Sequence, residues 1–179
     1  MFLGRIHWIK GLDFLAEGFA KAAETRDDMV LVIVGNDDGY KPALEKLVDG
    51  LGIRNKVLFA GFLAGDDKLA ALVDADAVVQ TSRYEQGAWA PFEAVLCETP
   101  IIVSDNSGAG EDARRIDAGY LVEFGDRHEL ARLIAKTIDD PAEARAKAVK
   151  AAAHIRKNMS LASRIADYEE LYTRVRAQK

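Results

Sequence analysis

Two glutamates flank a turn near the middle of this chain and could together bind hydroxyl groups or stabilise charge. Glu85 and Glu93 stand eight positions apart within TSRYEQGAWAPFEA, residues 81–94. The apolar run before this stretch is typical of a buried strand, and the residues after Pro91 follow a helical pattern. We therefore interpret it as a strand-to-helix turn, with one carboxylate in the loop and the other in the first helical turn.

The start of this predicted helix is suited to an anion. Pro91 fits the first helical position, because its φ is fixed and it has no amide hydrogen to leave unpaired. Ala90 would then occupy the capping position, where its methyl group cannot accept a hydrogen bond from the first amides. These amides lie at the positive end of the helix dipole and favour a ligand such as phosphate.

The two glutamates allow different interpretations. Glu93 is either a residue that stabilises the helix start through the dipole or a bidentate acceptor for two neighbouring hydroxyls, such as a ribose diol. Glu85 lies in the loop and has no helix of its own to stabilise. It is either a solvated charge or a group that faces a ligand.

A second loop, GRIHWIKG at residues 4–11, supplies two cations. Arg5 suits planar, bidentate contacts with oxygen atoms, and Lys10 supplies a point charge. If these two cations lie beside the start of the helix that follows residue 90, they form a pocket for a doubly charged group. Taken alone, two cations in a loop are usually solvated. His7 lies between them, and a lone histidine is more often a surface or packing residue than a ligand.

A third loop, SDNSGAGED at residues 104–112, combines turn-forming Asp and Asn with glycines that allow close backbone approach. One interpretation is a cradle of amides for a diphosphate or a sugar. The simpler interpretation, which we favour, is a tight connection in which Glu111 and Asp112 begin the next helix.

Short apolar runs alternate with helical patterns along the whole chain. Strands are predicted at 1–6, 29–35, 56–61, 76–82, 100–105 and 118–124, and helices at 12–22, 41–52, 66–75, 92–98, 126–140, 141–158 and 160–178. This alternation predicts an α/β fold, a doubly wound parallel sheet with helices on both faces. In such sheets ligands bind at the carboxyl ends of the strands, where the three loops begin.

Composition limits the classes of function. The 179 residues, of which 49% are apolar and 30% charged, suffice for one domain with a sizeable core. A formal net charge of −5 argues against a domain that coats nucleic acid or an anionic membrane. The single cysteine, Cys97, fits a reducing cytosol and, with three scattered histidines, makes a poor zinc set. The first predicted strand begins at residue 1, with almost no residues before it. We therefore expect that the chain begins partway into a longer polypeptide.

Together these segments resemble the C-terminal half of a retaining glycosyltransferase of family 4, a group with two Rossmann-like domains known as GT-B. The resemblance rests on GR…KG, VLVIVGN, VLFAGFL, DAVVQTSRYE, FEAVLCETPIIVSDNSGAGE and GYLVEFGD, and runs to about residue 140. Its most specific element is the pair of glutamates separated by seven residues. It implies one donor-binding domain over 1–179, with C-terminal helices from about 141–179. It also implies a last helix that crosses to an N-terminal acceptor domain absent from this chain.

The resemblance also implies roles for individual residues. Arg5 and Lys10 would contact the diphosphate of a nucleotide sugar, such as a UDP- or GDP-hexose. Glu93 would hold the ribose hydroxyls, and Glu85 would lie near the hexose. Backbone atoms would meet sugar and phosphate oxygens at Ala88, Trp89 and Ala90, and the nucleotide would be lined by Gly35, Gly61, Phe62 and Leu63. No cofactor is implied, and no metal: these loops contain no Asp-x-Asp motif, so the cations would replace a divalent ion.

The activity implied for the full-length protein is transfer of a hexose, glucosyl or mannosyl, to an acceptor hydroxyl on a glycan or glycolipid. Such a protein would make polysaccharides or glycolipids in the cytoplasm, or at the inner membrane face through its other half. The isolated domain would bind nucleotide diphosphate but turn over little or no sugar. Gln86, Gly87 and Ala88 stand where Gly-Phe-Gly often follows the first glutamate, and Trp89 is large for its position. Both departures bear on which sugar is transferred.

Other classes stay open. One alternative is a non-catalytic Rossmann-like module in which both glutamates are structural, and another is half of a nucleotide-sugar epimerase. A dinucleotide-dependent oxidoreductase is disfavoured, because no G-x-G-x-x-G turn follows the first strand.

Overall fold

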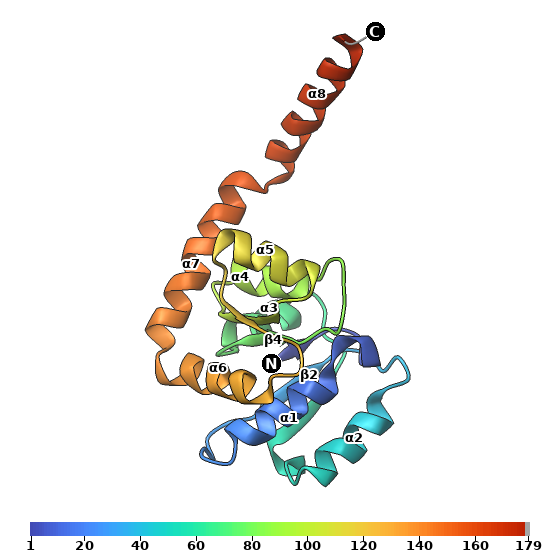
Figure 1. The fold of residues 1–179 in the computed structure, drawn as a ribbon, viewed down its shortest axis with the longest axis vertical. Coiled ribbons are helices and arrows are strands. Elements are labelled where there is room, and N and C mark those ends of the chain that lie inside the picture. The colour runs from blue at the N-terminus through green and yellow to red at the C-terminus, as the bar shows by residue number, and fades with distance from the viewer. Residues whose placement is uncertain (178–179) are drawn as a thin grey trace.

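In a computed structural model, which describes residues 1–177, strands alternate with helices along the chain (Figure 1). The strands are β1 (Phe2–Leu3), β2 (Leu31–Val34), β3 (Val57–Gly61), β4 (Val78–Gln80), β5 (Ile101–Ser104) and β6 (Tyr120–Val122). The helices are α1 (Leu12–Ala22), α2 (Lys41–Gly50), α3 (Gly65–Asp74), α4 (Ala90–Leu96), α5 (Gly108–Ile116), α6 (Arg127–Asp139), α7 (Pro141–Asn158) and α8 (Leu161–Ala177). Short 3-10 turns lie at Trp8–Lys10 and Arg54–Lys56.

The strands form two parallel three-stranded sheets, in the orders β1-β2-β3 and β4-β5-β6. The sheets meet edge to edge, because the Val79 amide donates to the Met1 carbonyl oxygen over 2.9 Å. The combined order is 3-2-1-4-5-6, with a switch point between β1 and β4 where the winding direction reverses. The predicted doubly wound parallel sheet is therefore confirmed, and its switch point is where open α/β sheets bind their ligands.

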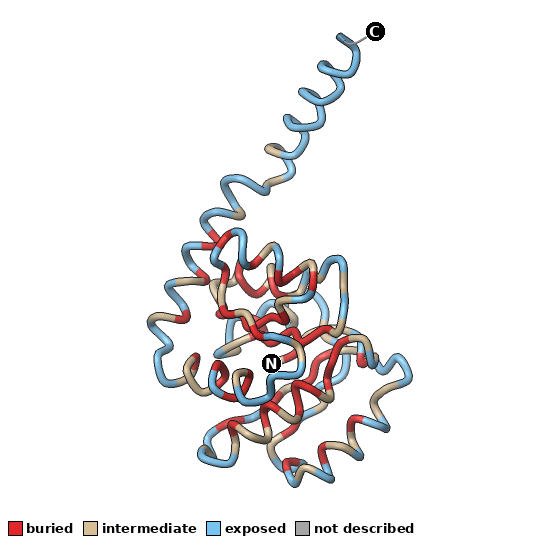
Figure 2. The backbone as a smooth tube through the Cα atoms, viewed as in Figure 1, coloured by how far each residue is buried: buried red, intermediate tan, exposed pale blue. Residues whose placement is uncertain are grey.

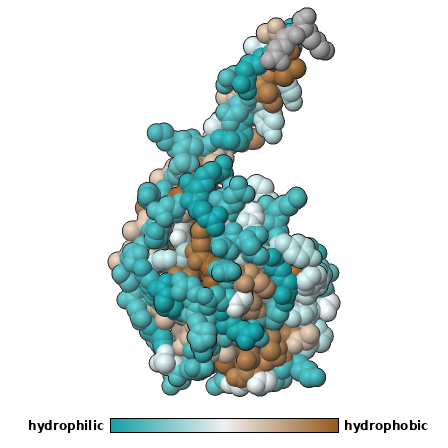
Figure 3. Space-filling view, viewed as in Figure 1, coloured by the Kyte–Doolittle hydropathy of each residue, from teal (hydrophilic) through white to brown (hydrophobic). Residues whose placement is uncertain are grey.

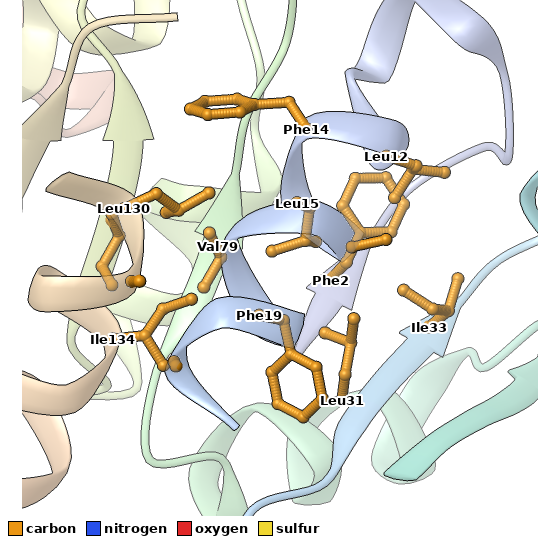
Figure 4. Close-up of a cluster of buried hydrophobic side chains, with 14 of the residues drawn as sticks. Phe2, Leu12, Phe14, Leu15, Phe19, Leu31, Ile33, Val79, Leu130 and Ile134 are labelled. Carbon is orange, nitrogen blue, oxygen red and sulfur yellow. The ribbon is translucent and has the colours of Figure 1, made fainter. Parts of the chain in front are cut away.

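Apolar side chains cover both faces of the sheet, which explains why strands such as LVIV and IIVS are apolar without alternation. On one face, Leu15 and Phe19 of α1 and Leu130 and Ile134 of α6 pack over strand residues that include Phe2 and Leu31 (Figure 4). On the other face, α4, α5 and α7 contribute smaller residues, among them Ala94, Val95, Ala113, Ala151 and Ala152. The small residues let these helices approach the sheet closely.

Several boundaries differ from the sequence prediction, and those of α5 and β1 lie next to the candidate site loops. Helix α5 begins at Gly108, ahead of Glu111 and Asp112, because the Ser107 hydroxyl caps it by accepting the Gly110 amide over 3.1 Å. Strand β1 ends at Leu3, and the predicted strand residue Ile6 makes an isolated bridge to Asp37.

The two C-terminal helices differ in how they contact the domain. Helix α7 runs along the body and buries alanines on one side (Figure 2). Helix α8 extends away from the body, and Figure 3 shows apolar side chains on its surface. Its exposed large apolar residues are Leu161, Ile165, Tyr168, Leu171, Tyr172 and Val175. Within residues 1–177, no helix is both long and apolar enough to cross a membrane.

Candidate functional site

The loops that follow β1 and β4 lie against each other at the switch point. The Arg83 amide donates to the Ile9 carbonyl oxygen over 2.9 Å, and the Thr81 hydroxyl donates to the Gly11 carbonyl oxygen over 3.0 Å. These hydrogen bonds join the basic loop at residues 4–11 to the start of the loop that carries Glu85.

Lys10 and Glu85 form an ion pair between the two loops. Lys10 ends the 3-10 turn at Trp8–Lys10 and is only 9% exposed. The other carboxylate oxygen of Glu85 accepts a hydrogen bond from the Ser82 hydroxyl over 2.8 Å. The Ser82 hydroxyl in turn accepts a hydrogen bond from the side-chain amide of the buried Gln80 over 3.0 Å. One cation and one carboxylate are therefore held at the carboxyl ends of β1 and β4, in largely enclosed surroundings.

Arg5 lies in different surroundings from Lys10. Its side chain is 68% exposed and pairs with Asp38, in the loop after β2, over 2.5 Å. The two cations of the basic loop thus have separate acidic partners in this structure. An exposed guanidinium on a surface ion pair is weakly held, so little free energy opposes its movement.

The start of α4 differs in detail from the prediction. Trp89 occupies the capping position with helical dihedral angles (φ −81°, ψ −33°), and Ala90 is the first helical residue, so the assignment of Ala90 as the cap was wrong. Pro91 fits the second helical position as well as the first, because the amides of the first turn are unpaired at both. The cap makes no side-chain hydrogen bond to these amides, and the Trp89 residue is 82% exposed.

Glu93 lies in the first turn of α4 and pairs with Lys68 of α3 over 2.9 Å. Its side chain is 40% exposed, and the hydrogen bond to Lys68 uses one of its two carboxylate oxygens. Lys68 holds this carboxylate in place, and the sequence offered no signal for it beyond a lysine in a predicted helix.

The carboxyl ends of β1, β2 and β3 meet through glycines. The Gly35 amide donates to the Gly61 carbonyl oxygen over 2.7 Å, and a Cβ at Gly35 would collide with the carbonyl oxygen of Gly4. Beyond Gly61, Phe62 is 66% exposed and Leu63 is half-buried. The backbones of the three strands therefore lie close together at this end of the sheet, and the exposed Phe62 side chain borders it.

The loop after β5 fastens the loop after β4 from its other side. The Gly108 amide donates to the Glu85 carbonyl oxygen and the Asn106 side chain donates to the Arg83 carbonyl oxygen, each over 2.7 Å. The Gly110 amide is used by the Ser107 cap. Because these amides have partners within the protein, the geometry favours the tight connection over a cradle for a ligand.

Sequence reasoning missed Arg83, which holds the two site loops together. Its guanidinium donates to the Trp8 carbonyl oxygen over 3.1 Å and pairs with Asp13. It also lies over the rings of Trp8 and Phe124, at 5.6 and 5.1 Å from their centroids. The signal in the sequence that could have identified Arg83 was a cation directly before Tyr84 and Glu85.

His7 has a structural role at the start of the 3-10 turn, where its Nδ1 accepts the Ile9 amide over 3.3 Å. This agrees with the interpretation of His7 as a packing residue. Within the described residues 1–177, no group of three or more His, Cys, Asp or Glu side chains is placed to hold a metal ion.

Comparison with known proteins identifies the family. Residues 1–155 match the family model described as glycosyl transferases group 1. The chain belongs to this family. Similar curated relatives include the 2-deoxystreptamine glucosyltransferase of Streptomyces kanamyceticus, 28% identical over 79% of this chain and 36% of the relative. Another is the mannosylfructose-phosphate synthase of Agrobacterium fabrum, 33% identical over 69% of this chain and 28% of the relative.

Solved structures of similar fold include a sucrose-phosphate synthase and a domain of a glycosyl transferase group 1 family protein. Anabaena Alr3699/HepE, solved in complex with UDP, has a TM-score of 0.85 and 25% identity, over 96% of this chain and 47% of that one. Sucrose-phosphate synthase of Thermosynechococcus elongatus has a TM-score of 0.83 and 25% identity, over 99% and 45%. The separately solved C-terminal domain of LpcC from Francisella tularensis has a TM-score of 0.75 and 23% identity, over 89% and 85%. The chain thus spans about a third of the length of these curated relatives and about half of the first two solved chains.

Proposed function

We propose that this domain binds the nucleotide-diphospho-sugar donor of a retaining glycosyltransferase of family 4. The observation that carries the proposal is the meeting of Lys10 and Glu85 at the switch point of a group 1 glycosyltransferase domain. Anabaena Alr3699/HepE, which has also been solved with UDP-glucose, supports a nucleotide sugar as the ligand class. The reaction transfers a hexose to an acceptor hydroxyl, with retention of the anomeric configuration.

In this proposal the basic residues stabilise the leaving group. Negative charge develops on the diphosphate as the bond to the sugar breaks, and preorganised donors at that point lower the barrier. Lys10 is already held at the switch point, and Arg5 joins it by leaving Asp38. The start of α4, where no side chain makes a capping hydrogen bond, adds backbone amides from Ala88, Trp89 and Ala90. These cations take the place of a divalent metal, and no cofactor takes part.

The carboxylates and the glycine-lined edge recognise the rest of the donor. Glu85 contacts the hexose, and Glu93, oriented by Lys68, accepts hydrogen bonds from the ribose hydroxyls. The nucleotide lies along the edge at Gly35, Gly61, Phe62 and Leu63, where the open space beside Gly61 allows a ligand to approach the backbone closely.

The complete enzyme is proposed to contain an N-terminal acceptor domain in addition to this one, with the whole chain 1–179 acting as the donor domain. The exposed apolar side of α8 supports a last helix that crosses to that domain. The acceptor is a glycan or glycolipid, and the sugar is glucose or mannose, which the names of the two curated relatives support. The protein acts in the cytoplasm or at the inner membrane face, and the domain alone is inactive.

Isothermal titration calorimetry of this chain with UDP, GDP, UDP-glucose and GDP-mannose tests the proposal. We expect saturable binding of the nucleotides of one base. Lys10→Met should weaken binding of the diphosphate far more than binding of the nucleoside. Failure of all four ligands to bind, or equal losses for diphosphate and nucleoside, would overturn it.

A further inference from the structure

Both side chains of the Lys10–Glu85 ion pair are largely buried, so each charge needs a partner of opposite charge or a hydrogen-bonding partner. The Lys10 side chain is 11% exposed and the Glu85 side chain is 20% exposed. Ser82 holds the second carboxylate oxygen, and the Gly108 amide holds the backbone of the same residue. Glu85 is therefore fixed in position, and its carboxylate stays beside Lys10 as long as no ligand separates them.

A ligand that binds only one member of such a pair leaves the other as an unpaired, largely buried charge. A largely buried charge that loses its partner is strongly disfavoured. Phosphate oxygens that approach Lys10 would also bring negative charge close to the Glu85 carboxylate, and two negative charges at close range repel each other. A ligand that supplies acceptors to Lys10 and hydroxyl donors to Glu85 at the same time avoids both penalties.

We propose that donor binding exchanges the Lys10–Glu85 ion pair for contacts with the ligand, and that this exchange makes the site select nucleotide sugars over free nucleoside diphosphates. The inference rests on the proposed function and adds a selection rule to it. A nucleotide sugar satisfies Lys10 with its diphosphate and Glu85 with its sugar hydroxyls. A nucleoside diphosphate satisfies Lys10 and leaves Glu85 facing the phosphates. After transfer the product is therefore held less well than the donor, which favours its replacement by a new donor molecule.

Glu85→Gln tests the exchange, because it keeps the size of the side chain and removes its charge. In titrations of this chain we expect the variant to bind UDP or GDP about tenfold more tightly than the unchanged chain does. The preference for UDP-glucose over UDP, or for GDP-mannose over GDP, should fall to less than about threefold. Glu170→Gln on α8, where the residue is exposed, changes the net charge equally and should alter neither affinity.

The possible outcomes separate this inference from the proposed function. Nucleotide binding by the unchanged chain, with equal losses or no change in Glu85→Gln, would overturn the exchange and leave the proposed function standing. Binding of none of the four ligands would overturn both. A ligand-free test uses thermal unfolding: Lys10→Met should lower the melting temperature, and adding Glu85→Gln should recover most of the loss. A double variant no more stable than Lys10→Met would also overturn the exchange, since the pair would then contribute nothing to the empty site.

Discussion

Gly11 lies so close to Thr81 that a methyl group does not fit between them. Gly11 has a left-handed φ of 62°, and a Cβ there would collide with the Thr81 carbonyl oxygen. The Thr81 hydroxyl donates back to the Gly11 carbonyl oxygen. This contact sets the spacing between the residue after Lys10 and the end of β4, so the geometry of the Lys10–Glu85 pair depends on it.

Gly11→Ala should therefore destabilise the chain, by about 2–4 kcal/mol, through the combined collision and backbone strain. Urea unfolding followed by circular dichroism measures the change. Gly50→Ala is a matched control, because Gly50 ends α2 and has open space around it. The control should be neutral or stabilise the chain by up to about 1 kcal/mol. Similar losses in both variants would mean that the Gly11–Thr81 contact does not exist.

Arg83→Lys should loosen the connection between the two site loops. Lysine keeps the charge but loses the planar fork that donates to Trp8 and Asp13 and lies over two aromatic rings. We expect a loss of about 1–2 kcal/mol in the free energy of unfolding and weaker nucleotide binding. Arg174→Lys, at an exposed position on α8, should stay within about 0.5 kcal/mol of the unchanged chain. A neutral Arg83→Lys would show that these contacts are not maintained in solution.

The fold was predictable because its strongest signals are local. The apolar runs LVIV and IIVS and the helical spacings between them identify a parallel sheet, and the loops then fall at its carboxyl edge. The start of α5 was misplaced because Ser107 is one of several possible caps in SDNSGAGED. The choice depends on the long-range contact of Gly108 with the loop at residue 85.

The site was predictable in its location and less so in its pairings. The sequence placed Arg5, Lys10, Glu85 and Glu93 at one edge of the sheet, because the carboxyl ends of parallel strands meet at the same edge. It could not place Arg5 with Asp38 or Glu93 with Lys68, because pairs between different loops and helices depend on side-chain directions in the folded state. Their roles in binding stay predictions.

Acid should weaken the attachment of α7 to the end of α5. Asp117 caps α5 with a left-handed φ of 53°, and hydrogen bonds from Lys147 and then Lys150 lower the pKa of its carboxyl group below the usual 3.8. A lowered folded-state pKa stabilises the fold above the unfolded value, and this stabilisation is lost as the pH falls through the folded-state pKa.

Asp117→Asn tests this contribution, because asparagine tolerates the left-handed conformation and carries no charge. At neutral pH the variant should lose about 0.5 kcal/mol, a small amount because the Asp117 side chain is 53% exposed. Urea unfolding at a series of pH values should show the difference from the unchanged chain shrinking as the pH falls below the usual aspartate range. A difference that stays constant with pH would mean that the loss comes from packing and not from charge.

The exposure of α8 predicts that it adds little to the stability of this chain. Tyr172→Ala, at a residue that is 66% exposed, should change the free energy of unfolding by less than about 0.5 kcal/mol. Leu130→Ala, at a fully buried residue of α6, should cost about 2–5 kcal/mol (Figure 4). In a polypeptide that includes the proposed acceptor domain, Tyr172→Ala should become destabilising, because the helix then has a surface to pack against. Equal behaviour of Tyr172→Ala in the short and long chains would contradict the crossing of α8 to that domain.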